Sequence, residues 1–184
     1  RGALVIAAAG NDPGGPEEVK GPMFPAGWEQ ESAPSPQQCV YLEGQGYQVN
    51  ALPRLFPPAG VNVYQPLVFA VGGVRGDDRP LASTRRGGRP RLAAPGAHAV
   101  AADVGDDGTL VPTDILTGSS VSAAVMSAVV ASTWGYRYEL SGPEVGALVR
   151  LASVDLGEPA DFCLGGAPCP CSDTDPRRYI HRVS

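Results

Sequence analysis

Two continuous apolar runs are the clearest strand signals in the chain. Residues 3–9 form the first run, which ends at a Gly-Asn-Asp-Pro turn, and residues 67–71 form the second, which ends at two glycines. Continuous apolar runs between turn residues are typical of strands that are buried on both faces of a parallel sheet. The pattern also predicts shorter strands at residues 91–94 and 98–102, on either side of a Pro-Gly turn.

Helical spacing follows in the second half of the chain. From Ser120 onward, valines recur at every fourth residue with alanines beside them, which predicts a small-residue helix buried centrally against the sheet. Ser141 and Glu144 then form the capping box of a second helix, with a proline in its first turn. The apolar face of this second helix is Val145, Leu148, Val149 and Ala152. The order strand, strand, helix, helix predicts a layered α/β domain.

Two segments lack these periods and are expected to lie outside the core. Residues 29–65 are rich in Pro, Gln and Gly and contain only short apolar stretches, so we interpret them as an insertion. Residues 158–184 contain three cysteines among prolines and glycines, and we expect this tail to lie over the surface without helix or strand. A chain of 184 residues with 43% hydrophobic content can form one domain with a buried core, which we assign to residues 1–157.

Charge and hydropathy argue against two classes of partner. The formal net charge is -5, Lys20 is the only lysine and the arginines are scattered, so no electrostatic footprint for nucleic acid is expected. The one basic run, residues 85–91, is interpreted as a solvated loop, with phosphate or partner binding as the alternative. No stretch of about 18 apolar residues occurs, so the sequence predicts no membrane span.

Candidate chemistry lies at the start of the first helix. Gly118-Ser119-Ser120 places a serine hydroxyl where the positive end of a helix dipole and unpaired backbone N–H groups meet. This arrangement is typical of a nucleophile, although a serine at a helix start often serves only as a cap. Upstream, Asn11 follows the first predicted strand, which would hold its side-chain amide at a fixed position.

Five motifs, taken in their order along the chain, carry a specific resemblance. They are Ala8-Ala9-Gly10-Asn11, Phe24-Pro25-Ala26, Phe69-Ala70-Val71-Gly72-Gly73-Val74, Leu92-Ala93-Ala94-Pro95-Gly96 and Gly118-Ser119-Ser120-Val121-Ser122-Ala123-Ala124. Over roughly residues 3–28 and 66–154, the chain resembles the C-terminal half of a subtilisin-like serine peptidase domain. The resemblance implies a parallel-sheet, three-layer α/β fold that an N-terminal part completes, and hydrolysis of peptide bonds through an acyl-enzyme.

The resemblance also implies a role for each matching residue. Ser120 would be the nucleophile, and Asn11 would stabilise the oxyanion together with the backbone N–H of Ser120. The peptide substrate would lie along four neighbouring residues, Ala9, Gly10, Gly118 and Ser119. The sequence departs from the family pattern at Ser119, Ser122 and Ala124, where the family usually has threonine, alanine and proline.

The family's catalytic aspartate and histidine lie upstream of the Ala-Gly-Asn strand, where this chain begins. His98 and His181 match no triad position, and the start at Arg1 without a methionine is interpreted as a processing boundary. A serine without its general base is a poor nucleophile at neutral pH. We therefore expect an N-terminal chain of the same peptidase to remain docked and to supply both groups. The alternative is a catalytically inactive subtilisin-like scaffold that acts as a partner-binding module.

The four cysteines favour a disulfide framework. Cys163 would pair with Cys169 or Cys171, which leaves the other for Cys39 or for the missing chain. Such a framework predicts an extracellular or otherwise extracytoplasmic location, with free thiols in a reducing compartment as the alternative.

No cofactor is required by this chemistry, but two metal ions are worth weighing. The cysteine spacing is a weak match to a zinc site because no suitably spaced histidine accompanies it. Calcium often stabilises the family, and Asp103, Asp106 and Asp107 form an acidic cluster. Their spacing matches no defined calcium loop, so calcium stays open as a structural ion.

Overall fold

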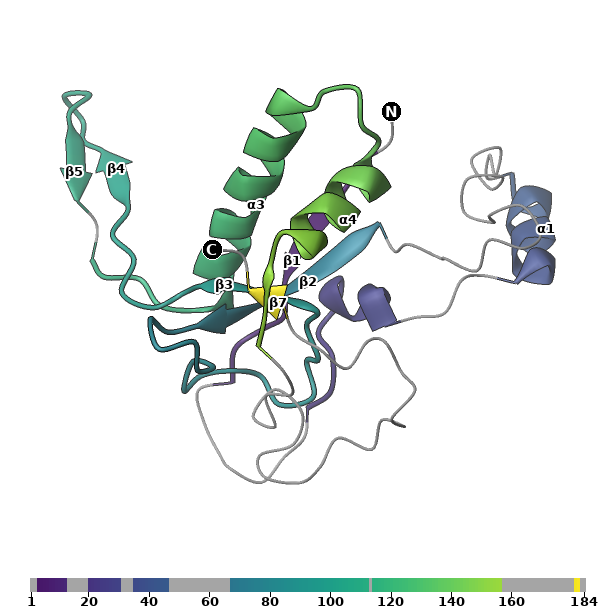
Figure 1. The fold of residues 1–184 in the computed structure, drawn as a ribbon, viewed down its shortest axis with the longest axis horizontal. Helices are drawn as coiled ribbons and strands as arrows, with labels where there is room; N and C mark the ends of the chain where they lie inside the picture. The colour runs from purple at the N-terminus through teal and green to yellow at the C-terminus, as the bar shows by residue number, and fades with distance from the viewer. Residues whose placement is uncertain are drawn as a thin grey trace.

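The structure is a computed structural model that describes residues 3–12, 20–30, 35–46, 67–112, 114–156 and 181–182. It shows an α/β fold built on a five-stranded sheet with the order β1-β2-β3-β7-β6 (Figure 1). The strands are β1 (Val5–Ala8), β2 (Val68–Val74), β3 (Leu92–Pro95), β7 (His181–Arg182) and β6 (Val154–Asp155). The first four run parallel and β6 runs antiparallel to β7. The predicted α/β class with a parallel sheet is therefore confirmed.

Helical elements pack on both faces of this sheet. α3 (Ser119–Tyr136) contacts β1, β2 and β3, and α4 (Gly142–Leu151) packs beside α3 on the same face (Figure 1). The short 3-10 helix η1 (Ala26–Gln30) contacts β1 and β2. A two-stranded hairpin of β4 (Ala102–Val104) and β5 (Leu110–Pro112) projects away from the sheet (Figure 1).

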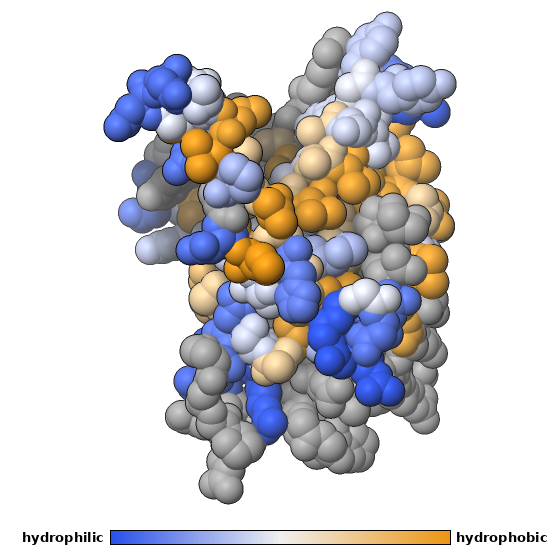
Figure 2. Space-filling view, turned by 90° about the vertical axis from the view of Figure 1, so that its left-hand side faces the viewer, coloured by the Kyte–Doolittle hydropathy of each residue, from blue (hydrophilic) through white to orange (hydrophobic). Residues whose placement is uncertain are grey.

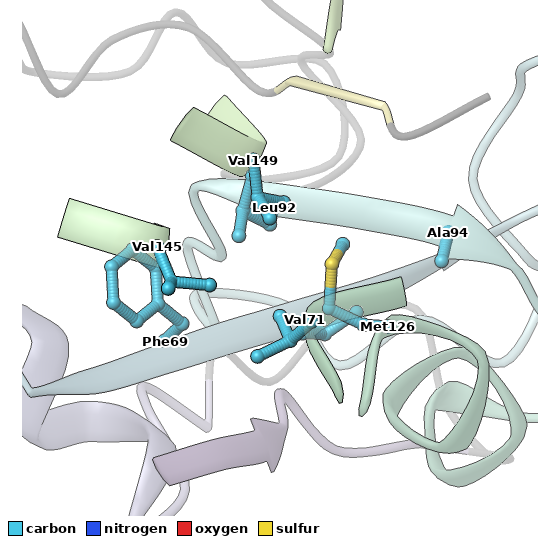
Figure 3. Close-up of a cluster of buried hydrophobic side chains, with 8 residues drawn as sticks. Phe69, Val71, Leu92, Ala94, Met126, Val145 and Val149 are labelled. Carbon is cyan, nitrogen blue, oxygen red and sulfur yellow. The ribbon is translucent and has the colours of Figure 1, made fainter. Parts of the chain in front are cut away.

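Successive side chains of β2 point to opposite faces of the sheet, so the two faces pack against different elements. Phe69 and Val71 belong to the core under α3 and α4, whereas Ala70 packs with Ala7 and Ala26 on the side of η1. The larger core, shown in Figure 3, is Phe69, Val71, Leu92, Ala94, Met126, Val130, Val145 and Val149. Burial of a large apolar side chain contributes about 1.5–3 kcal/mol, so these residues hold α3 and α4 on the sheet.

The predicted strands and helices are largely present. The predicted ranges 3–9, 67–71 and 91–94 overlap β1, β2 and β3, of which β2 and β3 extend past the predicted ends, and the two predicted helices correspond to α3 and α4. The Glu144 carboxylate accepts hydrogen bonds of 2.7 Å from both the backbone N–H and the hydroxyl of Ser141. These hydrogen bonds lower the pKa of Glu144 and confirm the predicted cap of α4.

The burial of the helices is more one-sided than the sequence predicts. α3 buries Ser119, Ser122, Met126 and Val130, while Val125 is 38% exposed, so only one face of this expected central helix is covered. On α4, Val145 and Val149 are buried as expected. The other two residues of its predicted apolar face, Leu148 and Ala152, are exposed.

The prediction of a strand at residues 98–102 was wrong. Ala99 forms only an isolated bridge with Leu116, and the strand begins at Ala102 as the first arm of a hairpin that was not predicted. Its turn is closed by a 2.8 Å hydrogen bond from the Gly105 N–H to the Thr109 carbonyl. A five-residue connection around an Asp-Gly pair is a known hairpin signal, so the sequence did contain the information.

The tail and the predicted insertion each contain regular structure. His181–Arg182 forms β7 between β3 and β6, which corrects the expectation of a tail without strand. α1 (Pro36–Gly44) lies within residues 29–65, the predicted insertion. In the described part of the chain, no helix combines the length and apolar character needed to cross a membrane.

Candidate active site

The end of β1 and the start of α3 meet in a small polar cluster, which we call the β1–α3 junction (Gly10, Asn11, Gly118, Ser119 and Ser120). The backbone N–H of Ser119 donates a 3.0 Å hydrogen bond to Asn11 Oδ1, across 108 residues of sequence. In return, the Gly10 N–H donates to Ser119 Oγ at 3.2 Å in a buried position. Two hydrogen bonds of opposite direction therefore fix the predicted oxyanion asparagine against the predicted nucleophile segment.

Gly10 is required by the path of the chain at the end of β1. Its φ of +100° lies in a region that favours glycine. A Cβ at this position would stand 2.8 Å from Arg85 Cδ and 3.3 Å from Met23 Cε. Gly10 therefore lets two side chains close in directly before Asn11.

Gly118 plays the matching role at the start of α3. It is the N-cap residue, its N–H donates to the Gly96 carbonyl at 2.8 Å, and its own carbonyl accepts from Val121 at 3.1 Å. A Cβ on Gly118 would lie only 2.9 Å from Asn11 Nδ2. The amide nitrogen of Asn11 therefore packs directly against the backbone that leads into Ser120.

Ser120 is the second residue of α3, and its side chain is exposed whereas that of Ser119 is buried. Because Gly118 occupies the cap position and makes no side-chain cap, the reading of Ser120 as a helix cap is wrong. No hydrogen bond from the Ser120 N–H is recorded to any residue that the structure describes. This N–H belongs to the first turn of α3, where the helix itself offers no acceptor.

Two donors at the junction therefore have no hydrogen-bond partner among the residues that the structure describes. Asn11 Oδ1 is held by Ser119, which leaves the Nδ2 group as the free half of the amide, and the Ser120 N–H is the second donor. The partial positive charge at the start of an 18-residue helix adds to both. This arrangement can bind an oxyanion next to the Ser120 hydroxyl.

The remaining predicted site residues lie around this centre. Ala9 is 4% exposed and its N–H donates to the Val71 carbonyl at 2.9 Å, so its backbone belongs to the sheet and its N–H is not available to a substrate. Ser122 is fully buried, and its hydroxyl donates weakly to the Gly118 carbonyl at 3.4 Å. The structure therefore brings the predicted residues together around Asn11 and Ser120.

The histidines and acidic residues do not join this cluster in the described chain. His98 is exposed, and its backbone N–H donates to Thr117 Oγ1 at 3.1 Å, but no hydrogen bond links its ring to Ser120. The Asp107 carboxylate accepts from both the N–H and the hydroxyl of Thr109, which lowers the pKa of Asp107. Across the described residues, no group of three or more His, Cys, Asp or Glu side chains is placed to hold a metal ion.

Two neighbours of the junction stand out in the structure. Arg85 begins the basic run 85–91, and the interpretation of this run as a solvated loop was wrong, because Gly87, Gly88 and Pro90 are buried and Arg85 is half-buried. Met23 was not singled out from the sequence. Arg85 contacts both Gly10 and residues 20–21, and Met23 lies beside Gly10. Their places beside Gly10 could not be predicted, because they depend on how the connection between β2 and β3 folds back toward β1. The predicted disulfides involve side chains outside the described part of the chain.

Comparison with known proteins gives partial matches among solved structures. No family model matches the chain, and no curated protein matches it. The MycP3 protease from the type VII (ESX-3) secretion system is 29% identical over 49% of this chain and 27% of its own, with a TM-score of 0.39. The serine protease MycP1, a component of the type VII (ESX-1) secretion system, is 28% identical over 51% of this chain and 27% of its own, with a TM-score of 0.41. The A-subunit of the AB5 toxin from E. coli is 17% identical over 88% of this chain and 48% of its own, with a TM-score of 0.49.

The chain thus spans about a quarter of the length of the two MycP proteases. At TM-scores below 0.5, these superpositions carry no argument about the reaction of this chain.

Proposed function

We propose that the chain carries the nucleophile and the oxyanion-binding half of a subtilisin-like serine endopeptidase. The contact between Asn11 Oδ1 and the Ser119 N–H supports the proposal, because it holds the Asn11 amide against the residue directly before Ser120. A serine at a helix start has many structural uses. A hydrogen-bond donor that is fixed independently next to the nucleophile segment is what an acyl-transfer site requires.

The chemistry assigns one step to each group. Ser120 Oγ attacks the scissile carbonyl carbon while its proton passes to a general base, and the carbonyl electrons move onto oxygen. The Ser120 N–H and Asn11 Nδ2 donate to that oxyanion. Its collapse expels the amine, which takes the proton from the base, and leaves an acyl ester on Ser120. Water then hydrolyses the ester by the same sequence.

The general base and its orienting carboxylate come from an N-terminal chain of the same peptidase. Two surfaces support this part of the proposal. Among the described strands, β1 pairs with β2 alone, so its other edge is open. Figure 2 shows apolar side chains gathered on the face that carries α3 and the hairpin, where Val125, Val104 and Leu110 are 38%, 65% and 74% exposed. An open strand edge and an apolar helix face fit a docked continuation of the sheet.

The substrate is a peptide or protein, and the chemistry requires neither nucleic acid nor a cofactor. Calcium stays a proposal as a structural ion. We also propose an extracytoplasmic location, which rests on the expected disulfides.

A fluorophosphonate probe tests the proposed reaction because it phosphonylates a serine only when a base activates it. We expect labelling of the purified protein at Ser120, located by peptide mass spectrometry, and its loss in Ser120→Ala. Ser122→Ala serves as the matched control because Ser122 is buried two residues away. Absence of labelling in correctly assembled protein would favour the catalytically inactive, partner-binding scaffold instead.

Intact mass and native mass spectrometry test the companion chain. We expect a second polypeptide of the same precursor to co-purify with the 184-residue chain. A single folded, monomeric species of 184 residues would contradict the two-chain proposal.

A further inference from the structure

Arg85 joins three parts of the chain directly behind the junction. It lies in the connection between β2 and β3 and is half-buried. Its backbone N–H donates to the Gly10 carbonyl at 3.3 Å. Its side-chain Nε donates to the Gly21 carbonyl at 2.9 Å, and Nη2 donates to the Lys20 carbonyl at 3.1 Å.

These contacts surround the residue that would bind the oxyanion. Asn11 follows Gly10, and the chain on its other side is held by a 2.7 Å hydrogen bond from the Asp12 N–H to the Ser83 carbonyl. The Asp12 carboxylate also pairs with Lys20 Nζ at 3.0 Å. Arg85 contacts Gly10 before Asn11 and Lys20 beyond it. It therefore ties the two ends of the segment that contains Asn11 to one rigid group.

We propose that Arg85 is a positioning residue that acts through Asn11 to hold the oxyanion-binding amide in place; this inference rests on the proposed peptidase function. The side chain itself lies behind Gly10, where its Cδ stands 2.8 Å from the position of a Gly10 Cβ. It fixes the backbone of Gly10 from one side while Ser119 Oγ fixes the Gly10 N–H from the other.

An arginine suits this role better than a lysine does. The guanidinium presents several N–H donors in one plane, and two of them reach carbonyl oxygens of successive residues here. A lysine ammonium is a single nitrogen on a flexible stem, so it cannot reproduce both contacts in a fixed plane. Arg85→Lys should therefore fail to restore the function of Arg85, although it keeps the charge.

Kinetics of the assembled enzyme separate positioning from general structure. Because the oxyanion forms only during the reaction, we expect Arg85→Ala to lower kcat by about tenfold with KM changed less than about twofold. Arg79→Ala is the matched control, since the Arg79 side chain is 77% exposed on the same connection and should leave kcat unchanged.

A double-mutant cycle with Asn11→Ala gives the decisive comparison. If Arg85 acts through Asn11, adding Arg85→Ala to the Asn11→Ala enzyme should change kcat by less than about twofold. The same tenfold loss in both backgrounds would overturn the proposal, because a general structural effect does not depend on the Asn11 amide.

Hydrogen exchange tests the same inference without any activity. In the full chain, we expect Arg85→Ala to speed exchange of the Gly10 and Asp12 amides by at least about fivefold relative to Arg79→Ala, while the α4 amides are unaffected. Unchanged exchange at Gly10 and Asp12 would overturn the role of Arg85 even if Ser120 reacts. Conversely, faster exchange without labelling of wild-type Ser120 would overturn the peptidase function and keep the positioning of Asn11 by Arg85.

Discussion

The polar groups of the β1–α3 junction and the carboxyl of Glu29 on η1 differ in how completely their hydrogen bonds are formed. At the β1–α3 junction, the Gly10 N–H, Ser119 N–H and Asn11 Oδ1 all have partners at 3.0–3.2 Å. On η1, Glu29 is fully buried, yet its Oε1 has no hydrogen-bond partner among the described residues. A satisfied polar network fixes its members in one geometry, whereas an unsatisfied carboxyl makes the fold sensitive to its charge.

The physical setting of Glu29 explains the second case. Burial raises its pKa from 4.5 to about 7, against the opposing charge of Arg91. Its Oε2 accepts from the Arg91 N–H at 3.3 Å, and the Arg91 guanidinium donates to the Glu29 carbonyl at 3.2 Å. The junction thus fixes the positions of its groups, whereas the raised pKa of Glu29 on η1 keeps this carboxyl largely protonated until the pH approaches about 7.

Asn11→Asp should produce the largest effect and shows what the satisfied network is for. Aspartate keeps the Oδ1 acceptor for the Ser119 N–H but lacks the Nδ2 donor of Asn11, so the protein should fold with nearly unchanged Tm. Loss of an oxyanion-hole donor lowers kcat by about 10²–10³, a magnitude measured in subtilisin. Asn11→Ala is the control, because it should lose both activity and stability. An active Asn11→Asp enzyme would remove Asn11 from the oxyanion site.

Glu29→Gln should remove the part of the pH dependence of unfolding free energy that comes from the buried Glu29 carboxyl. The β1–α3 junction contains no carboxyl group and makes no such contribution. The folded-state pKa is raised, so the stabilising contribution is complete below about pH 4.5 and is lost as the pH rises to about 7. One pKa unit corresponds to about 1.4 kcal/mol, so the wild-type chain should lose about 3 kcal/mol across this window relative to Glu29→Gln.

Urea unfolding at several pH values between 4 and 8 measures this difference. The comparison of the two proteins cancels the other carboxylates, including Asp107 and Glu144, whose pKa values are lowered. Parallel stability curves for wild type and Glu29→Gln would show that Glu29 is ionised or solvated in the folded protein.

Gly118→Ala should disturb the junction more than the fold. The new Cβ would stand 2.9 Å from Asn11 Nδ2 and displace the amide, so the rate of fluorophosphonate labelling at Ser120 should fall by at least about tenfold. The backbone conformation at Gly118 should add about 1–3 kcal/mol of destabilisation.

Gly108→Ala on the hairpin turn separates these two effects. Its φ of +79° is also unfavourable for alanine, but no heavy atom lies within 4 Å of the added Cβ. We expect a loss of stability with normal labelling. Equal labelling rates for Gly118→Ala and Gly108→Ala would contradict the close packing of Asn11 against Gly118.

Thr84→Val should have the smallest effect. It tests whether the Thr84 hydroxyl lacks a hydrogen bond although it lies next to the hydrogen-bonded groups of the junction. Thr84 forms an isolated bridge with Asn11, and its buried Oγ1 has no partner in the described chain. Valine keeps the shape and removes the hydroxyl, so chemical denaturation should show a gain of up to about 1 kcal/mol. A clear loss of stability would mean that the hydroxyl is bonded in solution.

The sequence predicted the centre of the site better than its surroundings. Asn11 and Ser120 were singled out through motifs that resemble the subtilisin-like family, and the structure joins Asn11 to Ser119, the residue before Ser120. The hydrogen bond from the Gly10 N–H to Ser119 Oγ could not be predicted in this way. It depends on the approach of two segments 109 residues apart, for which no local pattern exists.

Glu29 and the hairpin illustrate two different reasons for a missed feature. Glu29 stands in a Gly-Trp-Glu-Gln segment whose polarity predicts exposure, and only the packing of η1 on the alanine face of the sheet buries it. The hairpin was missed because β4 and β5 are three residues each and too short for a visible alternation. Its Asp107-Gly108 turn was the readable signal.

The two-residue strand β7 has a consequence for the order in which the protein is made. It pairs with β3 on one side and β6 on the other, so among the described strands β6 joins the main sheet through β7 alone. Strands β1 to β3 and helices α3 and α4 leave the ribosome earlier and can assemble first. Until His181 and Arg182 follow, the outer edge of β3 stays open to other chains, so the interval between the synthesis of α4 and that of β7 carries a risk of aggregation.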